Sequence, residues 1–260
     1  MTYQNILSEI KNGILYITIN REKKLNALNK ETLAELADAV AFARKSAEVK
    51  CVLLTGAGEK AFVAGADISE FSSYTPEQGE ALARNGQVTV FNAIENSPKP
   101  FLAAINGFAL GGGLELAMAC HIRVAADTAK MGLPEVTLGL IPGYGGTQRL
   151  TQLVGKGRAT EMIITAEMIT AEKAERIGLV NYSVPAQELI GRSEEILNKI
   201  MQRAPLAVAA AISAVNAVYC DGVNGFELEI EEFGKCFGNE DFKEGVTAFL
   251  TKRTPEFKSR

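Results

Sequence analysis

The first apolar residues of the chain fall in two short runs of the kind that form β-strands. Two runs rich in isoleucine and leucine lie within residues 6–20, on either side of Lys11-Asn12-Gly13. Because Asn-Gly readily adopts the positive φ angles of a tight turn, this segment is predicted to form a hairpin. The short apolar runs at 49–55, 100–106 and 122–126 predict three more strands.

Apolar residues recur at helical spacing in most of the remaining chain. The segment 29–46 is predicted to be a helix, and Asn29 can cap its first turn. The segment 75–94 is predicted to be another helix, because Pro76 stands where a missing N–H costs nothing. The same periodicity predicts helices at 114–120, 147–154, 158–165, 171–177, 187–202, 205–219, 224–237 and 241–252.

Short strands interleaved with helices, followed by a wholly helical tail, indicate an α/β fold with an appended helical region. The composition of the chain changes near Met201, and neither a fixed-period repeat nor a low-complexity segment is present in the sequence. We therefore expect a core that holds the active site at residues 1–200, and a helical region at residues 201–260.

Composition limits the classes of function. The 260 residues are 47% hydrophobic and 22% charged with a formal net charge of -4, which is typical of a folded soluble protein. The sequence has no basic stripe of the kind that binds nucleic acid. It also lacks a secretory signal, and its most apolar window, 205–220, is shorter than the roughly 20 residues of a membrane-spanning helix. We expect a cytoplasmic protein with no nucleic-acid or membrane partner.

Cysteine and histidine usage argues against metal and thiol chemistry. His121 is the only histidine, and no two of the four cysteines have C-x-x-C spacing. A metal site is therefore not expected. A Ser-His-Asp triad would have to use His121, which is interpreted as a structural residue at the end of a helix. Gly56-Ala57-Gly58 only partly resembles a dinucleotide fingerprint, because an apolar turn at 62–65 follows in place of a helix.

Two glycine-containing turns remain as candidate binding sites. Ala64-Gly65-Ala66-Asp67 follows an apolar run, and Gly111-Gly112-Gly113 opens a helix. Glycine lets a ligand approach the backbone closely, and the first N–H groups of a helix suit an anion. Two such groups that converge on one oxygen would form an oxyanion hole. Each turn is equally compatible with an ordinary connection, in which Asp67 caps a helix.

Two glutamates stand among apolar neighbours. Glu115 lies within 113–118, and Glu135 lies within 132–136. Burial disfavours a charged carboxylate, so the pKa of each side chain is expected to rise towards the range useful for acid–base catalysis. The alternative interpretation of Glu115 is a favourable charge in the first turn of a helix. The alternative for Glu135 is a surface position after a proline.

A series of long motifs follows in a fixed order along the chain. They are Asn20-Arg21, 25–28, 61–68, 104–117, Pro134-Glu135, 138–143, 145–150, Ala248-Phe249 and Lys252-Arg253. Over essentially the whole chain these motifs resemble the crotonases, the family of enoyl-CoA hydratases and isomerases. The resemblance implies a crotonase-type spiral of ββα units with a C-terminal helical trimerisation region, often assembled as a dimer of trimers.

The resemblance also implies the substrate and the catalytic residues. The substrate is an acyl thioester of coenzyme A, so coenzyme A is part of the substrate and no separate cofactor is expected. The backbone N–H groups of Ala66 and Gly112 would hold the thioester oxygen, and Glu115 and Glu135 would be the catalytic pair. By family analogy Glu135 handles the proton at the α-carbon, Glu115 orients the water, and the Gly143 N–H helps to place it.

Contacts to the coenzyme A moiety are implied in two parts of the chain. Those near the N-terminus fall on Lys24, Leu25, Ala27, Ala64, Asp67 and Ile68. Near the C-terminus, Phe249 and Lys252 match an adenine and phosphate contact that a neighbouring subunit donates. The alternative interpretation of this last pair is a core aromatic residue and a solvated lysine.

Because the chain retains both glutamates, the resemblance implies a hydratase, which reversibly converts 2-trans-enoyl-CoA to 3-hydroxyacyl-CoA. Tyr144 stands where smaller residues are common, and we hypothesise that Tyr144, Phe71 and Tyr74 limit the acyl pocket to short chains such as crotonyl. The first alternative is a Δ3,Δ2-enoyl-CoA isomerase or an acyl-CoA hydrolase. The second is an RNA-binding relative, although acidic residues interrupt any basic stripe in 29–46.

Overall fold

Two β-sheets form the centre of the computed structural model, which describes residues 3–258. The larger sheet has six strands in the order β1-β2-β3-β5-β7-β10, and the smaller has four in the order β4-β6-β8-β9. The strands are β1 (Ile6–Lys11), β2 (Ile14–Ile19), β3 (Cys51–Gly56), β4 (Ala61–Val63), β5 (Phe101–Ile105), β6 (Phe108–Leu110), β7 (Ile122–Ala126), β8 (Lys130–Gly132), β9 (Ile169–Thr170) and β10 (Tyr182–Val184).

The hairpin predicted from Asn12-Gly13 is confirmed. β1 and β2 pair antiparallel, with Lys11 opposite Ile14. Asn12 and Gly13 have φ angles of 51° and 83°, the left-handed conformation that this dipeptide adopts at low cost. The strands predicted at 49–55, 100–106 and 122–126 are confirmed as β3, β5 and β7, which pair in parallel.

The helices predicted from the periodicity are also confirmed. Asn29 caps the first of them as expected, because its side chain accepts a hydrogen bond from the Thr32 N–H at 2.9 Å. The helices are α1 (Lys30–Lys45), α2 (Pro76–Gly86), α3 (Asn92–Glu95), α4 (Gly112–Ala119), α5 (Gly146–Val154), α6 (Lys156–Thr165), α7 (Ala171–Arg176), α8 (Leu189–Met201), α9 (Pro205–Ala217), α10 (Gly225–Cys236) and α11 (Glu240–Thr251).

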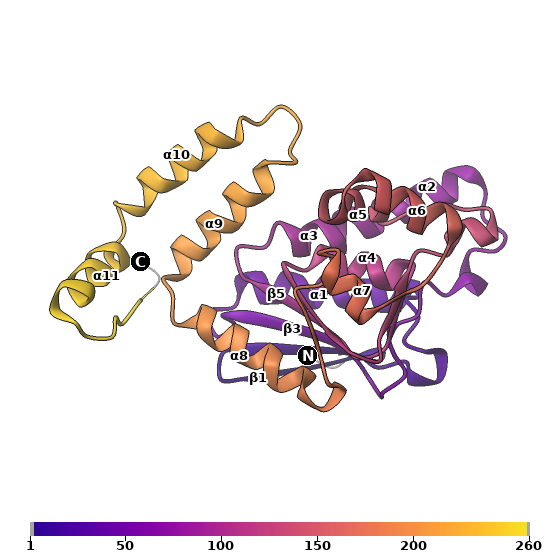
Figure 1. Ribbon diagram of the computed structural model, residues 1–260, viewed down its shortest axis with the longest axis horizontal. Coiled ribbons are helices and arrows are strands. Elements are labelled where there is room, and N and C mark those ends of the chain that lie inside the picture. Colours follow the sequence, from indigo (N-terminus) through magenta and orange to yellow (C-terminus); the bar gives the residue numbers. More distant parts are fainter. Residues whose placement is uncertain (1–2, 259–260) are drawn as a thin grey trace.

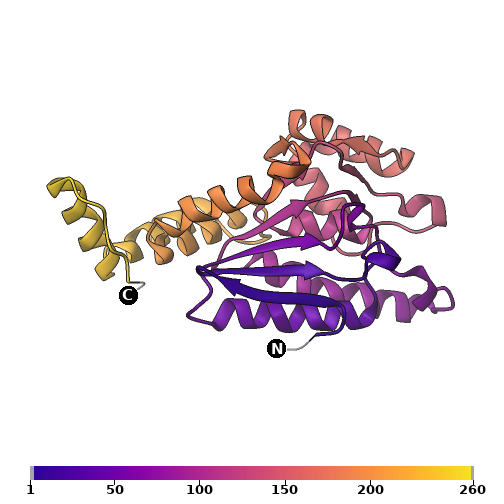
Figure 2. The same ribbon diagram turned by 90° about the horizontal axis from the view of Figure 1, so that it is seen from below.

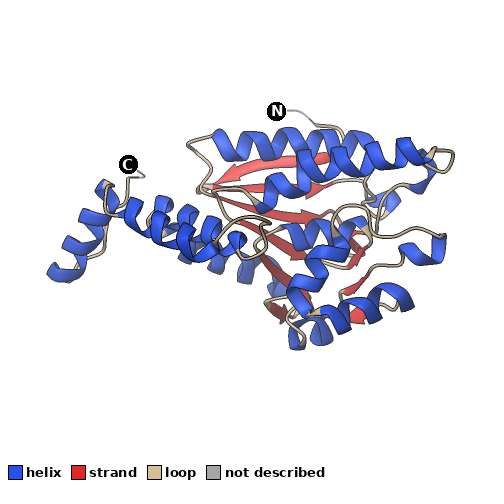
Figure 3. Ribbon diagram, turned by 90° about the horizontal axis from the view of Figure 1, so that it is seen from above, coloured by secondary structure: helices blue, strands red, loops and turns tan. Residues whose placement is uncertain are grey.

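Alternating side chains of the large sheet divide the interior into two apolar clusters. In β3, Val52 and Leu54 belong to one cluster and Leu53 belongs to the other, since successive strand residues point to opposite faces. α1, α3 and α4 contribute to the first cluster, and α8 contributes Leu189 and Leu197 to the second. Helices therefore flank the strands on both sides (Figures 2 and 3). This arrangement is the α/β fold that the order of elements predicted.

The helix predicted at 75–94 contains a π-helical turn that periodicity did not reveal. α2 runs into this turn at Gln87–Phe91, and α3 continues directly from it. A π turn inserts an extra residue into a helix and so changes which side chains face inwards. Here Gln87 Nε2 donates to the carbonyl oxygen of Gly143 at 2.7 Å, and Phe91 stacks on Tyr144 with ring centroids 4.7 Å apart.

Neither the small sheet nor strand β10 of the large sheet was predicted, and one interpretation of the sequence was wrong. Residues 62–65 were expected to form an apolar turn, but Phe62 and Val63 belong to β4, which pairs in parallel with β6. The strands of this sheet have two or three residues each. Runs of that length are too short for a period of two to be recognised. The small sheet matters because β4 and β6 both end at the candidate site.

α9, α10 and α11 form an arm that extends away from the sheets (Figure 1). α8 ends at Met201 and α9 begins at Pro205, and the chain bends by 108° between these two helical segments. Within residues 3–258 no single helix is long and apolar enough to cross a membrane, although the bent pair Ala186–Met201 and Pro205–Ala217 together have the required length and composition.

Gly113 fixes the distance between α4 and the small sheet. A Cβ atom at this position would lie 1.9 Å from the carbonyl oxygen of Val63, far inside van der Waals contact. α4 can therefore lie against β4 only because residue 113 has no side chain. This close contact places Gly112 and Glu115 of α4 next to the turn that follows β4.

The substitution Gly113→Ala is expected to lower the free energy of unfolding by about 1–3 kcal/mol, because the added methyl overpacks a backbone contact. Gly157→Ala is the matched control, since Gly157 also lies in a helix but a Cβ added there would meet no atom within 4 Å. That control is expected to be neutral or stabilising by up to about 1 kcal/mol. Urea denaturation of both variants measures the difference, and equal stability of the two would contradict the packing described.

Candidate active site

Both candidate turns and both glutamates meet at one cavity of about 360 Å³. The turn after β4, the junction of β6 with α4, one side of α2 and the loop that precedes α5 form its walls. Among residues 3–258, Glu115 and Glu135 are the only charged residues in a lining that is otherwise mostly apolar. The sequence-predicted site residues that line it are Ala64, Ala66, Ile68, Phe71, Gly112, Glu115, Glu135, Gly143 and Tyr144.

Glu115 is a buried carboxylate that the backbone holds from one side. Its side chain is only 1% exposed, and its Oε1 accepts hydrogen bonds from the N–H groups of Tyr144 and Gly146, both at 2.7 Å. Gly146 allows this approach, because a Cβ there would lie 2.9 Å from the same Oε1. The Gly146 N–H is free to donate because it stands in the first turn of α5.

Burial is the main cause that raises the pKa of Glu115, to about 7, and the negative charge of Glu135 raises it further. The two backbone N–H groups and the positive charge of Arg149 act in the opposite direction. The rise expected from the apolar sequence context is thus found in the structure. A carboxyl group with this pKa exchanges a proton readily near neutral pH.

Glu135 faces the cavity from the 3-10 helix Glu135–Leu138. Burial raises its pKa as well. Its Oε2 is a buried side-chain oxygen with no hydrogen-bond partner among residues 3–258. An unpartnered oxygen is costly for a charged carboxylate and easily satisfied by a proton or by a bound ligand.

Gly111 brings the Glu135 carboxylate close to the start of α4. Its φ of 50° lies in the left-handed region, and a Cβ there would lie 2.8 Å from Glu135 Oε1. The three glycines therefore have different roles. Gly111 leaves room for the Glu135 carboxylate, the Gly112 N–H faces the cavity, and Gly113 leaves room for β4.

Ala66 and Gly112 present two backbone N–H groups to the cavity walls. Within residues 3–258 neither N–H donates to a protein acceptor, although the neighbouring Asp67 and Gly111 N–H groups do. The Gly112 N–H is also at the positive end of α4, where a helix favours negative charge. This pair can therefore bind an oxygen that carries developing negative charge.

Tyr144 fills one side of the cavity with a fixed ring. The ring is 6% exposed and stacks on Phe91. Gly86 and Gly112 leave room for the edges of the ring. A Cβ added at Gly86 would lie 2.4 Å from a ring carbon, and one added at Gly112 would lie 3.4 Å from another. Phe71 also lines the cavity, whereas Tyr74 does not and instead packs edge-on against Phe71 with ring centroids 6.4 Å apart.

Several residues expected to contact coenzyme A lie outside this cavity. Lys24, Leu25 and Ala27 precede the turn and do not line it. The Asp67 side chain accepts hydrogen bonds from Ser69 and Arg21, which lower its pKa, and it makes no cap to the helix that follows. These contacts fix the Asp67 side chain, and its contact with coenzyme A stays a prediction.

Phe249 and Lys252 lie at the end of the arm and are not brought to the cavity of their own subunit. Phe249 is 83% exposed, so it is not a core aromatic residue in a single copy of the chain. Lys252 ends α11 in the left-handed conformation, with a φ of 56°. The core interpretation of Phe249 is therefore wrong for the isolated subunit.

His121 has the structural role that was expected. Its Nδ1 accepts a hydrogen bond from the Phe101 N–H at 2.9 Å, and its Nε2 lies 3.1 Å from the carbonyl oxygen of Glu95. Burial lowers its pKa to about 4, so the ring is neutral at physiological pH. Within the described part of the chain, no group of three His, Cys, Asp or Glu side chains is placed to hold a metal ion.

Three residues that support the site were not among those predicted from the sequence. Gln87, Gly146 and Arg149 all touch the loop 143–146 or Glu115. A signal for Gly146 was present, because glycines just before a predicted helix leave N–H groups free to donate. Gln87 could not be found, since its orientation depends on the π turn.

Comparison with known proteins identifies the family of this chain. Residues 9–260 match the enoyl-CoA hydratase/isomerase family, and this chain belongs to that family. It is 48% identical to the short-chain-enoyl-CoA hydratase of Clostridium acetobutylicum and 45% identical to the crotonyl-CoA hydratase of Syntrophomonas wolfei, in each case over 100% of both chains.

Solved structures show the same architecture. The crystal structure of an enoyl-CoA hydratase from Bacillus anthracis has a TM-score of 0.92 and 40% identity to this chain, and the alignment covers 99% of this chain and 100% of that one. The crystal structure of an enoyl-CoA hydratase subunit from Geobacillus kaustophilus gives 0.93 and 37%, with 99% of both chains covered. The crotonase-type fold implied by the sequence motifs is therefore confirmed.

The raised pKa of Glu115 makes a testable contribution to stability. The Glu115 carboxyl group keeps its proton up to about pH 7 in the folded chain, whereas its ordinary pKa is 4.5. The stabilisation that comes from this raised pKa is therefore complete below pH 4.5 and is lost as pH rises through 7. Relative to Glu115→Gln, the wild type is expected to lose about 3 kcal/mol of unfolding free energy over this interval. Urea denaturation at a series of pH values measures it.

The control for this series is Glu161→Gln, which changes an exposed glutamate on α6. Its unfolding free energy is expected to follow the wild type at every pH. A wild-type curve parallel to that of Glu115→Gln between pH 4.5 and about pH 8 would show that Glu115 does not hold a proton in the folded chain.

Proposed function

We propose that this chain reversibly adds water to the double bond of a 2-trans-enoyl-CoA, giving a 3-hydroxyacyl-CoA. The main support for this proposal is that the Glu115 and Glu135 carboxyl groups share one apolar cavity. The free N–H groups of Ala66 and Gly112 lie in the walls of the same cavity. The names of the hydratases from C. acetobutylicum and S. wolfei support the same reaction.

The two N–H groups supply the electrostatic part of the reaction. When water attacks the β-carbon, electrons move towards the thioester carbonyl and its oxygen becomes negative. Donors fixed by the fold at Ala66 and Gly112 stabilise this charge more than they stabilise the neutral substrate. The turn after β4 and the start of α4 hold these donors in place before the substrate binds.

The two glutamates supply the proton transfers. The active form of the pair carries one proton, because the reaction needs one acid and one base. Glu115, fixed by Tyr144 and Gly146, orients the water and takes its proton as the oxygen attacks the β-carbon. Glu135 gives its proton to the α-carbon, and burial without a hydrogen-bond partner at Oε2 favours the protonated form that this step needs. One water molecule is thereby added, and protons within the pair are then redistributed.

Short acyl chains fit this cavity best. The fixed ring of Tyr144 and the side chain of Phe71 narrow it, while Leu82, Leu138 and Leu140 complete an apolar wall. Tyr74 plays a lesser part than the sequence suggested, because it contacts Phe71 and not the cavity. We propose the crotonyl thioester as a good substrate.

Hydration of crotonyl-CoA, followed by the loss of absorbance of the conjugated thioester, tests the function. Glu115→Gln and Glu135→Gln are each expected to lower kcat by about 10²- to 10⁴-fold, because each removes one partner in proton transfer. Glu161→Gln on the surface of α6 is the matched control and is expected to retain the wild-type rate.

The same assay distinguishes the alternatives. A series of substrates from about four to sixteen carbons is expected to show the highest kcat/KM at the short end, since extra methylenes must fit beside Tyr144. Equal rates throughout would remove the short-chain proposal. Conversion of a 3-enoyl-CoA without hydration of crotonyl-CoA would point to an isomerase, and wild-type rates in both glutamate variants would reject the mechanism.

We also propose that residues 201–260 assemble the chain into a trimer or a dimer of trimers. On α10, Phe226, Ile230 and Phe233 recur at a spacing of four and three residues and are 82%, 62% and 65% exposed. An apolar stripe of this size is expected to be covered by another copy. Such an assembly would let Phe249 and Lys252 reach a neighbouring subunit's coenzyme A. A cytoplasmic location stays a prediction.

The double substitution Phe226→Asp and Ile230→Asp is expected to reduce the oligomer to smaller species in sedimentation velocity, because it charges the apolar stripe. Glu231→Gln, which changes an exposed glutamate on another face of the same helix, is the control and is expected to leave the assembly unchanged. A monomeric wild type, or a double variant of unchanged size, would contradict an interface on α10.

A further inference from the structure

A buried arginine lies directly behind the loop that holds Glu115. Arg149 on α5 is 6% exposed, and its Nη1 donates to the carbonyl oxygen of Tyr144 at 2.8 Å. Gly145, with a φ of 93°, makes room for this contact, because a Cβ there would lie 2.3 Å from the same Nη1. The guanidinium therefore touches the loop but not the cavity in which the substrate is proposed to bind.

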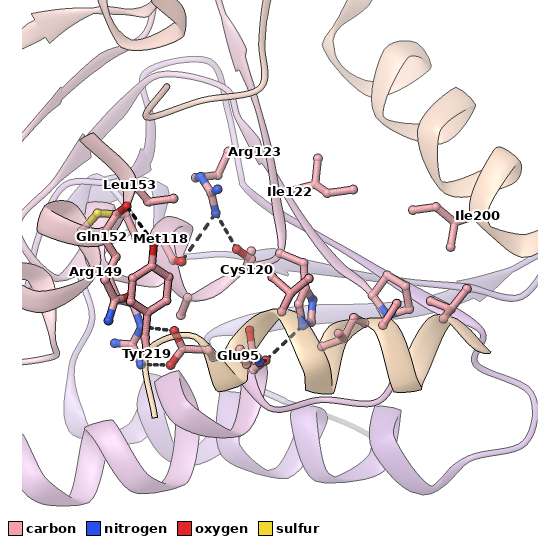
Figure 4. Close-up of a pocket in the computed structure, with 18 of the residues that line it drawn as sticks. Glu95, Met118, Cys120, Ile122, Arg123, Arg149, Gln152, Leu153, Ile200 and Tyr219 are labelled. Atoms are coloured by element: carbon pink, nitrogen blue, oxygen red, sulfur yellow. Dashed lines mark hydrogen bonds and ion pairs between the residues drawn. The ribbon is translucent and has the colours of Figure 1, made fainter. Parts of the chain in front are cut away.

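The guanidinium is held in one orientation by two side chains of α3. Nη2 donates to Glu95 Oε2 and to Asn92 Oδ1, both at 2.7 Å, and Nε donates to Glu95 Oε1 at 3.2 Å. Figure 4 shows the Arg149 side chain meeting the Glu95 carboxylate. This two-pronged geometry is specific to arginine, because a lysine ammonium cannot form both parallel contacts.

Glu95 is itself fixed by groups on two other elements. Its carbonyl oxygen accepts a hydrogen bond from Asn216 Nδ2 of α9 at 2.7 Å. The same oxygen lies 3.1 Å from His121 Nε2, which carries the ring proton because Nδ1 accepts from Phe101. These groups line a second cavity of about 460 Å³ between the core and α9 (Figure 4).

The contacts form a continuous path from the arm to the reacting carboxylate. Asn216 binds Glu95, Glu95 binds Arg149, Arg149 binds the Tyr144 carbonyl, and the Tyr144 N–H binds Glu115 Oε1. Every hydrogen bond in this path is 2.7 or 2.8 Å long. Groups that do not line the proposed substrate cavity are therefore linked to Glu115 by hydrogen bonds.

We infer that Arg149, held by Glu95 and Asn92, is a positioning residue that fixes the loop whose N–H groups orient Glu115. The inference rests on the proposed function, since Arg149 acts only through Glu115. A catalytic group displaced by about 1 Å can lose about 10²-fold in rate, while substrate binding elsewhere in the cavity is retained. Loss of Arg149 is therefore expressed in kcat rather than in KM.

Steady-state hydration of crotonyl-CoA by Arg149→Lys tests the inference. This variant is expected to lose about ten- to a hundredfold in kcat, with KM within about threefold of the wild type. Asn92→Ala keeps the ion pair and loses one contact, so it is expected to lose less in kcat, again without a rise in KM. Asn92→Ala also serves as the test if Arg149→Lys fails to fold.

Arg123→Lys is the matched control. Arg123 is also a buried arginine, but it donates to the carbonyl oxygens of Leu179 and Cys120 and, over longer distances, to those of Ala117 and Met118 at the end of α4. It makes no hydrogen bond to the loop 143–146. It is expected to lower the thermal unfolding midpoint while keeping the wild-type kcat. Wild-type kcat in Arg149→Lys, or equal kcat losses in the Arg123 and Arg149 variants, would overturn the inference. An inactive wild type would instead reject the proposed function.

Discussion

The structure depends on burying the Glu115 carboxylate in an apolar cavity without neutralising it by a direct ion pair. Two backbone N–H groups, from Tyr144 and Gly146, take the place of a cation, and Arg149 acts from behind the loop. A direct arginine partner would hold the carboxylate ionised over the whole physiological range. The observed arrangement instead leaves its pKa at about 7, where it can give or take a proton.

The rest of the fold supplies the close approaches that this arrangement needs. Gly113 brings α4 against β4, Gly111 admits Glu135, and Gly145 admits the Arg149 guanidinium. The π turn before α3 brings Gln87 and Phe91 into contact with the loop 143–146. The three glycine contacts require a residue without a side chain, and the contacts of Gln87 and Phe91 require a turn that a regular α-helix lacks. The positions of the two glutamates and of the loop 143–146 are thus set by backbone geometry.

Much of this was predictable from local sequence. The hydrophobic pattern predicted the helices and five of the six strands of the large sheet, but not β10. The apolar neighbours of Glu115 and Glu135 predicted their raised pKa values. The small sheet was not predictable, because strands as short as Ile169–Thr170 show no period. Nor was the clamp of Arg149 by Glu95, since these residues are far apart in sequence and their pairing depends on how α3 packs against α5.

The proposed mechanism requires that the Ala66 and Gly112 N–H groups bind the thioester oxygen between Glu115 and Glu135. A crystal structure with butyryl-CoA, a saturated thioester that cannot be hydrated, tests it most directly. The account predicts the thioester oxygen within about 3 Å of both N–H groups, with the two carboxylates beside the α- and β-carbons. A thioester bound outside this cavity, or a carbonyl turned away from both N–H groups, would contradict it.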